Sequence, residues 1–329
     1  EEIFIMAKFK VYYTIELNEV ATHIFESNDF EVKLCSHNDE ETYVKELAEF
    51  QPDAIMCRTE PITAKMMDTC KNLKVIGKQG AGLDNIDMDH AHAKDITVVY
   101  APAGNANAVA EHAVMLMLMC AKRFTYVDRQ FRGGNFLVRM GMEHTYELGG
   151  KTLGMIGCGR ISQLAMQKCK YGFGMNVIGY DPYLTQDKIG DLCELKATAK
   201  EVWEQADFVS VHLPVVPSTE HSIGREQFSW MKPTASFINC ARGALIKENE
   251  LVECLKDGTL FQAGLDVFEH EPIQESSREL FNLDNVIMTP HMAATTEQSV
   301  LNCCTSVAND IVAVCNGQEP KVKAQKPKF

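Results

Sequence analysis

The sequence predicts an α/β protein with two doubly wound parallel sheets, and three observations indicate this class. Short apolar segments rich in β-branched residues alternate with amphipathic stretches of helix length, as in parallel sheets covered by helices on both faces. The strand segments are too numerous for one ordinary open sheet, which favours two sheets. The length of 329 residues also suits about two domains.

The expected strands fall into two series along the chain. The first series is Phe9–Tyr13, Glu31–Leu34, Ala54–Cys57, Lys74–Gly77 and Ile96–Tyr100. The second series is Thr152–Ile156, Asn176–Tyr180, Phe208–His212, Ser236–Asn239, Ala263–Val267 and Val286–Thr289. Helices are expected between consecutive strands because parallel neighbours need crossover connections.

The connection between the two series is expected at the loop-like segment Ala101–Gly104, before a long helix from Asn105 to Lys122. The glycine-containing segment Arg132–Glu147 has no clear period and is interpreted as an extended connection or arm. A last helix, from about Glu297 to Cys315, has no strand after it. We expect this helix to return and cover the first sheet.

The composition excludes several classes of protein. Apolar residues make up 46% and charged residues 23% of the chain, which is ordinary globular usage and disfavours disorder, collagen or a coiled coil. The net charge of −13 argues against a large basic face for nucleic acid or anionic lipid. The longest apolar stretch, Ala113–Ala121, is far shorter than the ~20 residues of a membrane span.

The twelve cysteines show no C-x-x-C spacing, and most lie in apolar segments. They are interpreted as reduced thiols of a cytoplasmic protein rather than as a disulfide framework or a metal site.

A glycine loop directly follows the predicted strand Thr152–Ile156. Gly157 and Gly159 match the first two glycines of G-x-G-x-x-G, and Ser162 stands at the third position. Such a loop between a strand and a helix brings backbone N–H groups to the pyrophosphate of a dinucleotide. The next predicted strand ends at Asp181, an acid suited to hydrogen bonds from the adenosine ribose, which favours NAD over NADP.

Three polar residues follow the last three predicted strands. Arg242, Glu271 and His291 come after Ser236–Asn239, Ala263–Val267 and Val286–Thr289, and ligands of open α/β sheets bind beyond the carboxyl ends of strands. Arginine can bind a carboxylate or polarise a ketone. Histidine can exchange a proton near neutral pH, and a neighbouring carboxylate can orient it. Each residue alone is more often structural, but the set favours catalysis.

In its motifs and their order, the chain resembles the D-isomer-specific 2-hydroxyacid dehydrogenase family. The motifs are Gly80–Asp87, Val109–His112, Gly150–Gly154 leading into the glycine loop, His212–Pro214, Asn239–Gly243, Asp266–Pro272 and Thr289–His291. They extend over nearly the whole chain. The resemblance implies a Rossmann NAD-binding domain, residues 104–295, inserted into a flavodoxin-like substrate-binding domain made of residues 1–103 and 296–329.

The resemblance also implies a role for each site residue. His291 would be the general acid for ketone reduction and the base for alcohol oxidation, Glu271 would hold it and raise its pKa, and Arg242 would bind the substrate. Further substrate contacts are implied for Arg58, Gly80, Ala81, Gly82 and Asn105. Cofactor contacts are implied for Gly157, Gly159, Arg160, Ile161, Asp181, His212, Pro214, Cys240, Ala241 and Asp266. A homodimer through the NAD-binding domain, with Arg132–Glu147 as its arm, is expected.

The sequence departs from the family pattern at Ser162, at Ala108 and at Met292–Ala294, but none of these changes removes a proton-transfer or carboxylate-binding group. Four other histidines, His112, His212, His221 and His270, are interpreted as structural. So are Met115, Met117 and Met119, as core or dimer interface. No metal site and no nucleic-acid or membrane partner is expected.

The substrate is expected to be a small 2-hydroxy or 2-keto acid. The Gly77–Asp87 region and Cys57–Thr59 look most like the phosphoglycerate dehydrogenase branch, and Arg58 and Lys78 could meet a phosphate. Against that reading, Glu60 would repel a phosphate, so glyoxylate or hydroxypyruvate is an equal alternative. The chain stops after its last helix, and no regulatory domain is expected.

Two other functions are weighed against this reading. Formate dehydrogenase is disfavoured because it has glutamine where Glu271 stands. A non-catalytic NAD-sensing scaffold, like the family's transcriptional corepressors, keeps the same trio and stays open.

Overall fold

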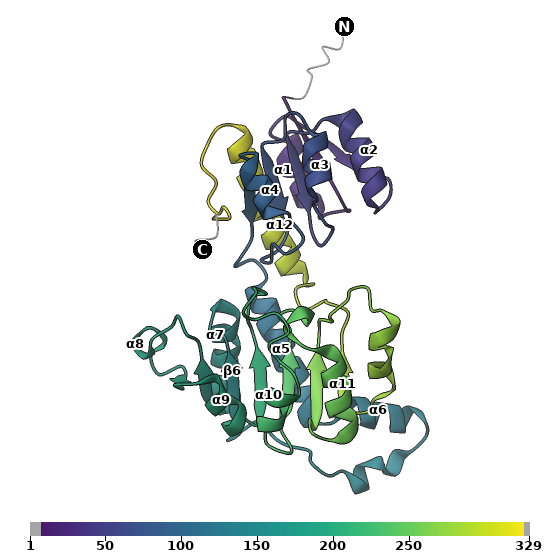
Figure 1. Ribbon diagram of the computed structural model, residues 1–329, viewed down its shortest axis with the longest axis vertical. Coiled ribbons are helices and arrows are strands. Elements are labelled where there is room, and N and C mark those ends of the chain that lie inside the picture. Colours follow the sequence, from purple (N-terminus) through teal and green to yellow (C-terminus); the bar gives the residue numbers. More distant parts are fainter. Residues whose placement is uncertain (1–7, 326–329) are drawn as a thin grey trace. The chain divides into compact units, whose positions relative to one another are not determined.

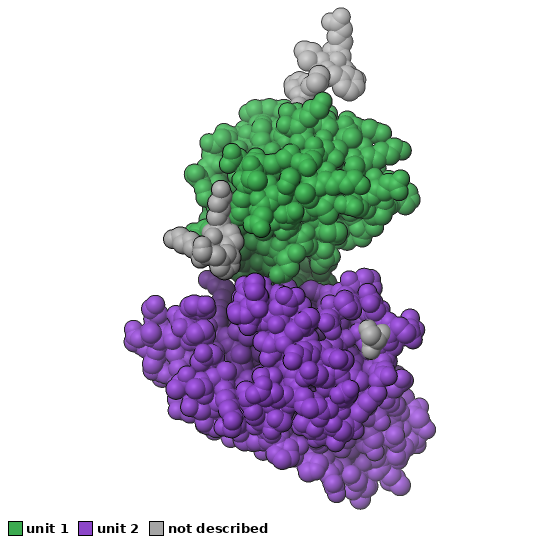
Figure 2. All heavy atoms as spheres, viewed as in Figure 1, with its two compact units in different colours: residues 1–105, 294–329 green, residues 106–293 purple. Residues whose placement is uncertain are grey.

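The computed structural model describes residues 8–325. It divides into two compact units, shown in Figure 2, in which residues 1–105 and 294–329 form unit 1 and residues 106–293 form unit 2. The ends of the predicted substrate-binding domain, residues 1–7 and 326–329, lie outside the described residues.

Unit 1 contains a five-stranded parallel sheet in the order β2-β1-β3-β4-β5. Its strands are β1 (Phe9–Tyr13), β2 (Phe30–Leu34), β3 (Ala54–Cys57), β4 (Val75–Lys78) and β5 (Thr97–Tyr100). Its helices are α1 (Glu19–Glu26), α2 (Glu40–Phe50), α3 (Ala64–Thr69), α4 (Met88–Ala93) and α12 (Glu297–Cys315).

Two separate apolar cores show that both faces of this sheet are covered. One core joins the sheet to α1 and α12 through residues such as Phe25, Val307 and Ile311. The other joins it to α2, α3 and α4 through residues such as Leu47, Met66 and Ala91. Gly77 on β4 leaves the room that α12 needs, since a Cβ there would lie 2.5 Å from Ile311. The last helix therefore packs on the first sheet, as the sequence predicts.

Unit 2 contains a seven-stranded parallel sheet in the order β12-β11-β10-β9-β6-β7-β8. Its strands are β6 (Thr152–Ile156), β7 (Asn176–Tyr180), β8 (Glu194–Leu195), β9 (Phe208–Val211), β10 (Ser236–Asn239), β11 (Gln262–Leu265) and β12 (Val286–Met288). The central strands β6, β9, β10 and β11 are almost wholly buried, as expected of a parallel sheet covered on both sides.

Helices cover both faces of this second sheet (Figure 1). They are α5 (Ala106–Ala121), α6 (Phe124–Arg132), α7 (Arg160–Gln167), α8 (Gln186–Ile189), α9 (Ala199–Gln205), α10 (Arg225–Trp230) and α11 (Glu248–Asp257), with short helical turns η1 (Phe136–Gly141), η2 (Lys168–Gly172), η3 (Gly243–Leu245) and η4 (Glu275–Asn282). Helix α5 is mostly buried because its sequence is apolar on nearly all sides.

The two parallel sheets confirm the predicted fold class. The two-residue edge strand β8 was not predicted, and the predicted arm Arg132–Glu147 is irregular only in part, because α6 ends at Arg132 and η1 spans Phe136–Gly141. No helix in residues 8–325 is long and apolar enough to cross a membrane. All twelve cysteines are free, and all but Cys35 are buried.

Candidate active site

The glycine loop lies between β6 and α7, and Gly157 is fixed there by geometry. Its φ of +86° lies in the left-handed region, which favours glycine. A Cβ at this position would lie 2.6 Å from the carbonyl oxygen of His212. The loop can therefore pass close to the end of β9 only with glycine at this point.

Gly159 differs from Gly157, because its φ of −72° is ordinary and a Cβ there would meet nothing within 4 Å. It is the N-cap of α7 and provides no side chain to cap the helix. The first-turn N–H groups of a helix have no intrahelical acceptor and carry a partial positive charge. Such donors suit the pyrophosphate of a dinucleotide, and no side chain at Gly159 would stand in its way.

Ser162 replaces the third glycine of the motif and has a structural reason to be there. Its side chain is fully buried, and its hydroxyl donates a 2.6 Å hydrogen bond to the carbonyl oxygen of Gly157. The serine thus holds the start of α7 to the start of the loop. Serine in place of the third glycine therefore adds a hydrogen bond within the loop.

Asp181 follows β7 and its carboxylate lies beside the glycine loop. Its Oδ2 accepts a 2.9 Å hydrogen bond from the Cys158 N–H, and its Oδ1 accepts one of 2.9 Å from the Tyr183 N–H. These bonds fix the carboxylate while leaving acceptor capacity on both oxygens. The ribose contact implied for Asp181 stays a prediction.

Arg242 lies directly after β10 on a loop that Asn239 organises. The fully buried Asn239 side chain donates to the carbonyl oxygen of Arg242 and accepts from the Ala241 N–H, both at 2.9 Å. The next residue, Gly243, packs so tightly that a Cβ would lie 1.9 Å from the backbone of Phe268. This close approach brings the Arg242 loop against the loop that carries Glu271.

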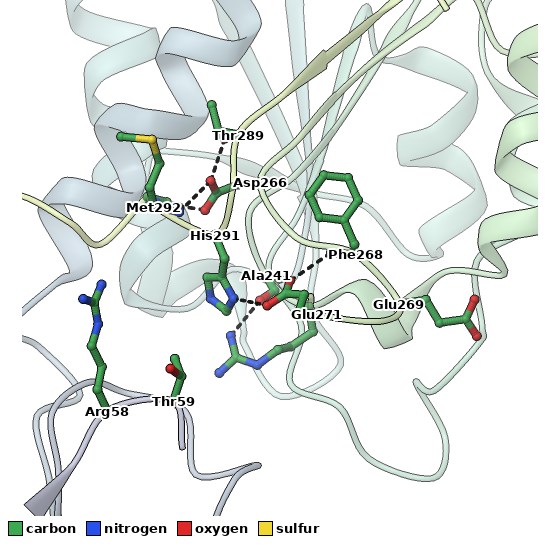
Figure 3. Close-up of polar contacts among 12 residues, drawn as sticks. Arg58, Thr59, Ala241, Asp266, Phe268, Glu269, Glu271, Thr289, His291 and Met292 are labelled. Carbon is green, nitrogen blue, oxygen red and sulfur yellow. Dashed lines mark hydrogen bonds and ion pairs between the residues drawn. The ribbon is translucent and has the colours of Figure 1, made fainter. Parts of the chain in front are cut away.

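His291 and Glu271 form the central pair of the site (Figure 3). Nδ1 of His291 lies 2.5 Å from Oε2 of Glu271, and Oε1 of Glu271 accepts a 3.0 Å hydrogen bond from the Phe268 N–H. Burial raises the pKa of Glu271, but the hydrogen bonds from His291 and Phe268, with the charge of Arg242, outweigh it and lower the pKa overall. Glu271 is thus an ionised partner for an imidazole that remains about one-third exposed.

Asp266 organises the loop that carries His291 (Figure 3). Its carboxylate is completely buried and accepts hydrogen bonds from the Thr289 hydroxyl (2.6 Å), the Met292 N–H (2.9 Å) and the Ala293 N–H (2.9 Å). Its carbonyl oxygen accepts a 2.7 Å bond from the His291 N–H. These bonds support the left-handed φ of +50° at His291, which is uncommon for a residue other than glycine.

His112 joins this network, although the sequence reading treats it as structural. Its Nε2 lies 2.8 Å from the Thr289 hydroxyl and 3.4 Å from Oδ1 of Asp266. Burial lowers the pKa of His112, although Asp266 acts in the opposite direction. A single histidine in an apolar helix does not indicate which residues it contacts. The only sequence feature that could have indicated a role for His112 is its place in the motif Val109–His112.

The other predicted cofactor residues lie around the same sheet edge of unit 2. His212 follows β9, and its Nε2 lies 2.9 Å from the Ser210 hydroxyl; burial lowers the pKa of His212 to about 4. Cys240 is buried, which raises the pKa of its thiol. The rest are exposed or partly exposed: Arg160, Ile161, Pro214 and Ala241.

The remaining predicted substrate residues belong to unit 1. Arg58 follows β3 and donates a 2.8 Å hydrogen bond to the Thr295 hydroxyl. Gly80, Ala81 and Gly82 follow β4, and Gly80 has a positive φ of +141°. The side-chain oxygen Oδ1 of Asn105 is buried and has no hydrogen-bond partner among the described residues; the substrate contact implied for Asn105 stays a prediction.

Glu60, which argues against a phosphate in the sequence reading, turns away from solvent. The residue is 5% exposed, and its Oε2 accepts hydrogen bonds from the Thr14 hydroxyl (3.0 Å) and the Arg58 N–H (2.9 Å). Within residues 8–325, no cluster of three or more His, Cys, Asp or Glu side chains is arranged to hold a metal ion.

Comparison with known proteins agrees with this arrangement. Residues 114–293 match the family model for the NAD-binding domain of D-isomer-specific 2-hydroxyacid dehydrogenases. This match confirms the resemblance seen in the sequence, and NAD is the cofactor of this domain.

Two relatives illustrate the similarity along the chain. A D-3-phosphoglycerate dehydrogenase from Methanocaldococcus jannaschii is 39% identical over 311 residues, which cover 94% of this chain and 58% of that protein. A hydroxypyruvate reductase from Thermotoga maritima is 36% identical over 296 residues, which cover 89% of this chain and 94% of that protein. The chain thus spans little more than half the length of the first relative and nearly all of the second.

Two solved structures have the same fold over almost the whole chain. A D-lactate dehydrogenase from Aquifex aeolicus, complexed with NAD and lactic acid, has a TM-score of 0.84 at 26% identity and covers 97% of this chain and all of its own. A glyoxylate reductase from Paecilomyes thermophila has a TM-score of 0.86 at 25% identity and covers 97% of this chain and 99% of its own.

Proposed function

Because the chain belongs to the D-isomer-specific 2-hydroxyacid dehydrogenase family, we propose that it is an NAD-dependent oxidoreductase. The reaction moves a hydride between C4 of the nicotinamide and C2 of a small D-2-hydroxy acid or its 2-keto acid. The observation that carries the proposal is the 2.5 Å contact between His291 and Glu271, in the same unit as a glycine loop open to a pyrophosphate.

The proton in this reaction belongs to His291. In ketone reduction its Nε2–H gives a proton to the substrate oxygen while C2 receives the hydride, and in alcohol oxidation neutral Nε2 takes the proton back. Glu271 accepts the Nδ1–H bond, fixes the ring and stabilises the imidazolium form. When bound, NAD supplies the hydride acceptor or, as NADH, the hydride donor.

Arg242 binds the anionic end of the substrate in this proposal. Its planar guanidinium can hold a carboxylate with two parallel hydrogen bonds and can polarise the adjacent carbonyl. The loop bonds made by Asn239 and the close packing of Gly243 support a fixed place for Arg242. Backbone N–H groups of Ala81 and Gly82 are proposed as further carboxylate donors, and Asn105 as a polar contact.

We propose that unit 2 binds the cofactor and unit 1 contributes the remaining substrate contacts. The first-turn donors at Gly159, Arg160 and Ile161 would hold the pyrophosphate, and Asp181 would accept hydrogen bonds from the ribose. A carboxylate at that position disfavours the 2′-phosphate of NADP. The open space at Gly159 supports this assignment.

The substrate is proposed to be a small 2-keto or 2-hydroxy acid, with 3-phosphoglycerate, glyoxylate and hydroxypyruvate as the candidates. The relatives include a D-3-phosphoglycerate dehydrogenase and a hydroxypyruvate reductase, so their names support both a phosphorylated and an unphosphorylated substrate. The hydrogen bonds that Glu60 accepts from the Thr14 hydroxyl and the Arg58 N–H partly offset its negative charge and so reduce the objection to a phosphate. Arg58 is then the side chain proposed to meet such a phosphate.

We also propose a homodimer through unit 2 and a cytoplasmic location. The segment from α6 to η1 supports the dimer, because it exposes large apolar side chains that a partner copy could cover. These are Phe124, Phe131, Phe136, Leu137 and Met140. The cysteine spacing, read as reduced thiols, supports the location.

The test is a panel of glyoxylate, hydroxypyruvate, pyruvate and phosphohydroxypyruvate with NADH, followed by NADH absorbance. We expect NADH to be consumed with at least one of them, and His291→Ala to abolish turnover while NADH binding survives. Binding of NADH without turnover across the panel would favour the corepressor-like scaffold instead. Unchanged turnover in His291→Ala would remove His291 from its role.

A further inference from the structure

Helix α5 contributes one polar side chain, His112, to the hydrogen-bond network of Thr289 and Asp266. His112 lies in an otherwise mainly apolar, buried helix, and its imidazole is 9% exposed. A buried polar ring of this kind costs free energy unless it makes hydrogen bonds. Its Nε2 meets the Thr289 hydroxyl at 2.8 Å.

The direction of the hydrogen bonds in this network follows from the supply of protons. The Thr289 hydroxyl has one proton, and its oxygen lies 2.6 Å from Oδ1 of Asp266. A carboxylate at this distance can only accept, so the Thr289 hydroxyl donates to Asp266. His112 must then donate through Nε2–H to the oxygen of Thr289.

The same carboxylate holds the loop that presents His291. Asp266 accepts from the Met292 and Ala293 N–H groups, which follow His291 directly. Thr289 lies two residues before His291, and its carbonyl oxygen accepts a 3.0 Å bond from the His291 N–H. A change at Thr289 or Asp266 therefore moves the backbone on both sides of the imidazole.

We propose that His112 is a positioning residue for the reaction: its Nε2–H orients the Thr289 hydroxyl toward Asp266, and this chain of bonds fixes the backbone that presents His291. The inference rests on the proposed function, because it matters only if His291 moves a proton. His112 itself touches neither Glu271 nor His291 in the described contacts. Its effect passes through Thr289 and Asp266.

A neutral imidazole suits this role. Burial lowers the pKa of His112, and Asp266, the charged group that faces it, raises the pKa less than burial lowers it. The neutral ring has a single N–H, and the network requires that N–H on Nε2. The proposal thus specifies one tautomer.

Substitution with the two side-chain amides tests the inference. In His112→Gln the amide nitrogen can take the place of Nε2, whereas in His112→Asn it falls short by one bond. We expect kcat to fall about 10- to 100-fold in His112→Asn, with the KM for the keto acid and the Kd for NADH little changed, because a small misplacement of a reacting group costs rate. His112→Gln should recover most of kcat.

Thr289 provides a matched second pair. Thr289→Ser keeps the hydroxyl and should keep most of kcat, while the nearly isosteric Thr289→Val should lose as much as His112→Asn. Equal activity of the Gln and Asn variants, whether both high or both low, would overturn the proposal, since packing alone would then explain His112.

A readout without turnover separates this inference from the proposed function. In ¹⁵N-histidine-labelled protein, we expect His112 as the neutral Nε2–H tautomer, and the His291 ring signals should shift in His112→Asn but not in His112→Gln. An Nδ1–H or charged His112, or His291 signals unmoved by either variant, would overturn the proposal. If no keto acid is reduced but these shifts appear, the proposed function fails while the hydrogen-bond chain stands.

Discussion

At the scale of single residues, the geometry of His291 depends on the loop hydrogen bonds of Asp266 and Thr289. Four hydrogen bonds hold its positive φ of +50°. The His291 N–H donates to the carbonyl oxygens of Asp266 and Thr289, and the Met292 and Ala293 N–H groups donate to the Asp266 carboxylate. Strained backbone at a functional residue persists only where the surroundings fix it. The position of the imidazole that we propose transfers the proton is therefore a property of the loop as a whole.

Glu271→Gln tests the charge of the pair at this scale. Glutamine keeps the shape and can still accept the Nδ1–H bond, but it cannot stabilise an imidazolium by charge. We expect kcat to fall about 10- to 100-fold with NADH affinity unchanged. The control is Glu269→Gln, because Glu269 bonds to His221 at 2.8 Å and not to His291, and it should retain wild-type kcat.

Arg242, Glu271 and His291 could be predicted from the sequence because each lies on the loop after a strand of the parallel sheet, where ligands of such sheets bind. The network of His112, Thr289 and Asp266 could not be predicted in this way. The contact between His112 and Thr289 joins residues 177 positions apart, and periodicity along a chain carries no information on such pairs. Their roles in catalysis stay predictions.

At the scale of elements, the two glycines of the glycine loop are required for different reasons: Gly157 by backbone conformation and close packing, and Gly159 by the proposed cofactor contact. Gly157→Ala forces a side chain into the left-handed region and within 2.6 Å of the His212 carbonyl oxygen, so we expect a lower free energy of unfolding and loss of NADH binding. Gly159→Ala meets no protein atom within 4 Å and should cost only the small loss of a less favourable N-cap residue, while weakening NADH binding because its methyl group would stand in the open space.

Thermal unfolding and an NADH titration of both variants check this contrast. Equal destabilisation by the two substitutions would contradict the geometry of the loop. Unchanged NADH affinity in Gly159→Ala would show that the pyrophosphate does not occupy this space.

Ser162→Ala tests the bond that replaces the third glycine. The substitution leaves the Gly157 carbonyl oxygen without its buried 2.6 Å donor, and losing one such bond costs about 1 kcal/mol of unfolding free energy. We expect chemical denaturation to show a loss of this size. A variant as stable as the wild type would mean that the hydroxyl contributes nothing to holding the loop.

Strands were predictable wherever a buried apolar run is several residues long; β3, β6, β7 and β10 have the bounds expected from the sequence. The edge strand β8 has two residues, one of them charged, and gives no such run. The helical turn η1 could not be predicted because the glycines around it disfavour a helix. Short elements depend on tertiary contacts that local composition does not express.

At the scale of the whole molecule, the half-buried, neutral His212 couples folding to pH. Burial lowers the pKa of His212 to about 4 from its ordinary value of 6.5, and its ring partner is the uncharged hydroxyl of Ser210. Between these values the unfolded chain binds a proton at His212 and the folded chain does not. The unfolding free energy therefore falls as the pH drops from about 6.5 to about 4.

The expected loss from this one group is about 2–3 kcal/mol when the pH reaches 4. His212→Gln removes the titration, so the stability of the wild type relative to this variant should decrease over the same interval. Denaturation curves of both proteins at several pH values measure the difference. A difference that does not change with pH would show that His212 is not held neutral by the fold.

The fold class also belongs to this scale, and it was predictable because alternating strands and helices admit few other arrangements. The strand order β12-β11-β10-β9-β6-β7-β8 could not be predicted. The alternation of strands and helices determines neither which strand is central nor where the strand order reverses. The substrate was not predictable either, because it depends on a few side chains, among which Arg58 is proposed, and not on the fold.

The central claim is hydride transfer to C2 with a proton from His291. The most direct measurement supplies NADH with deuterium at both C4 positions together with the keto acid that the panel identifies, and locates the label in the product by mass spectrometry and NMR. The account predicts a D-2-hydroxy acid with one deuterium at C2, and none from His291→Ala. An L-configured product, or a product without deuterium at C2, would contradict it.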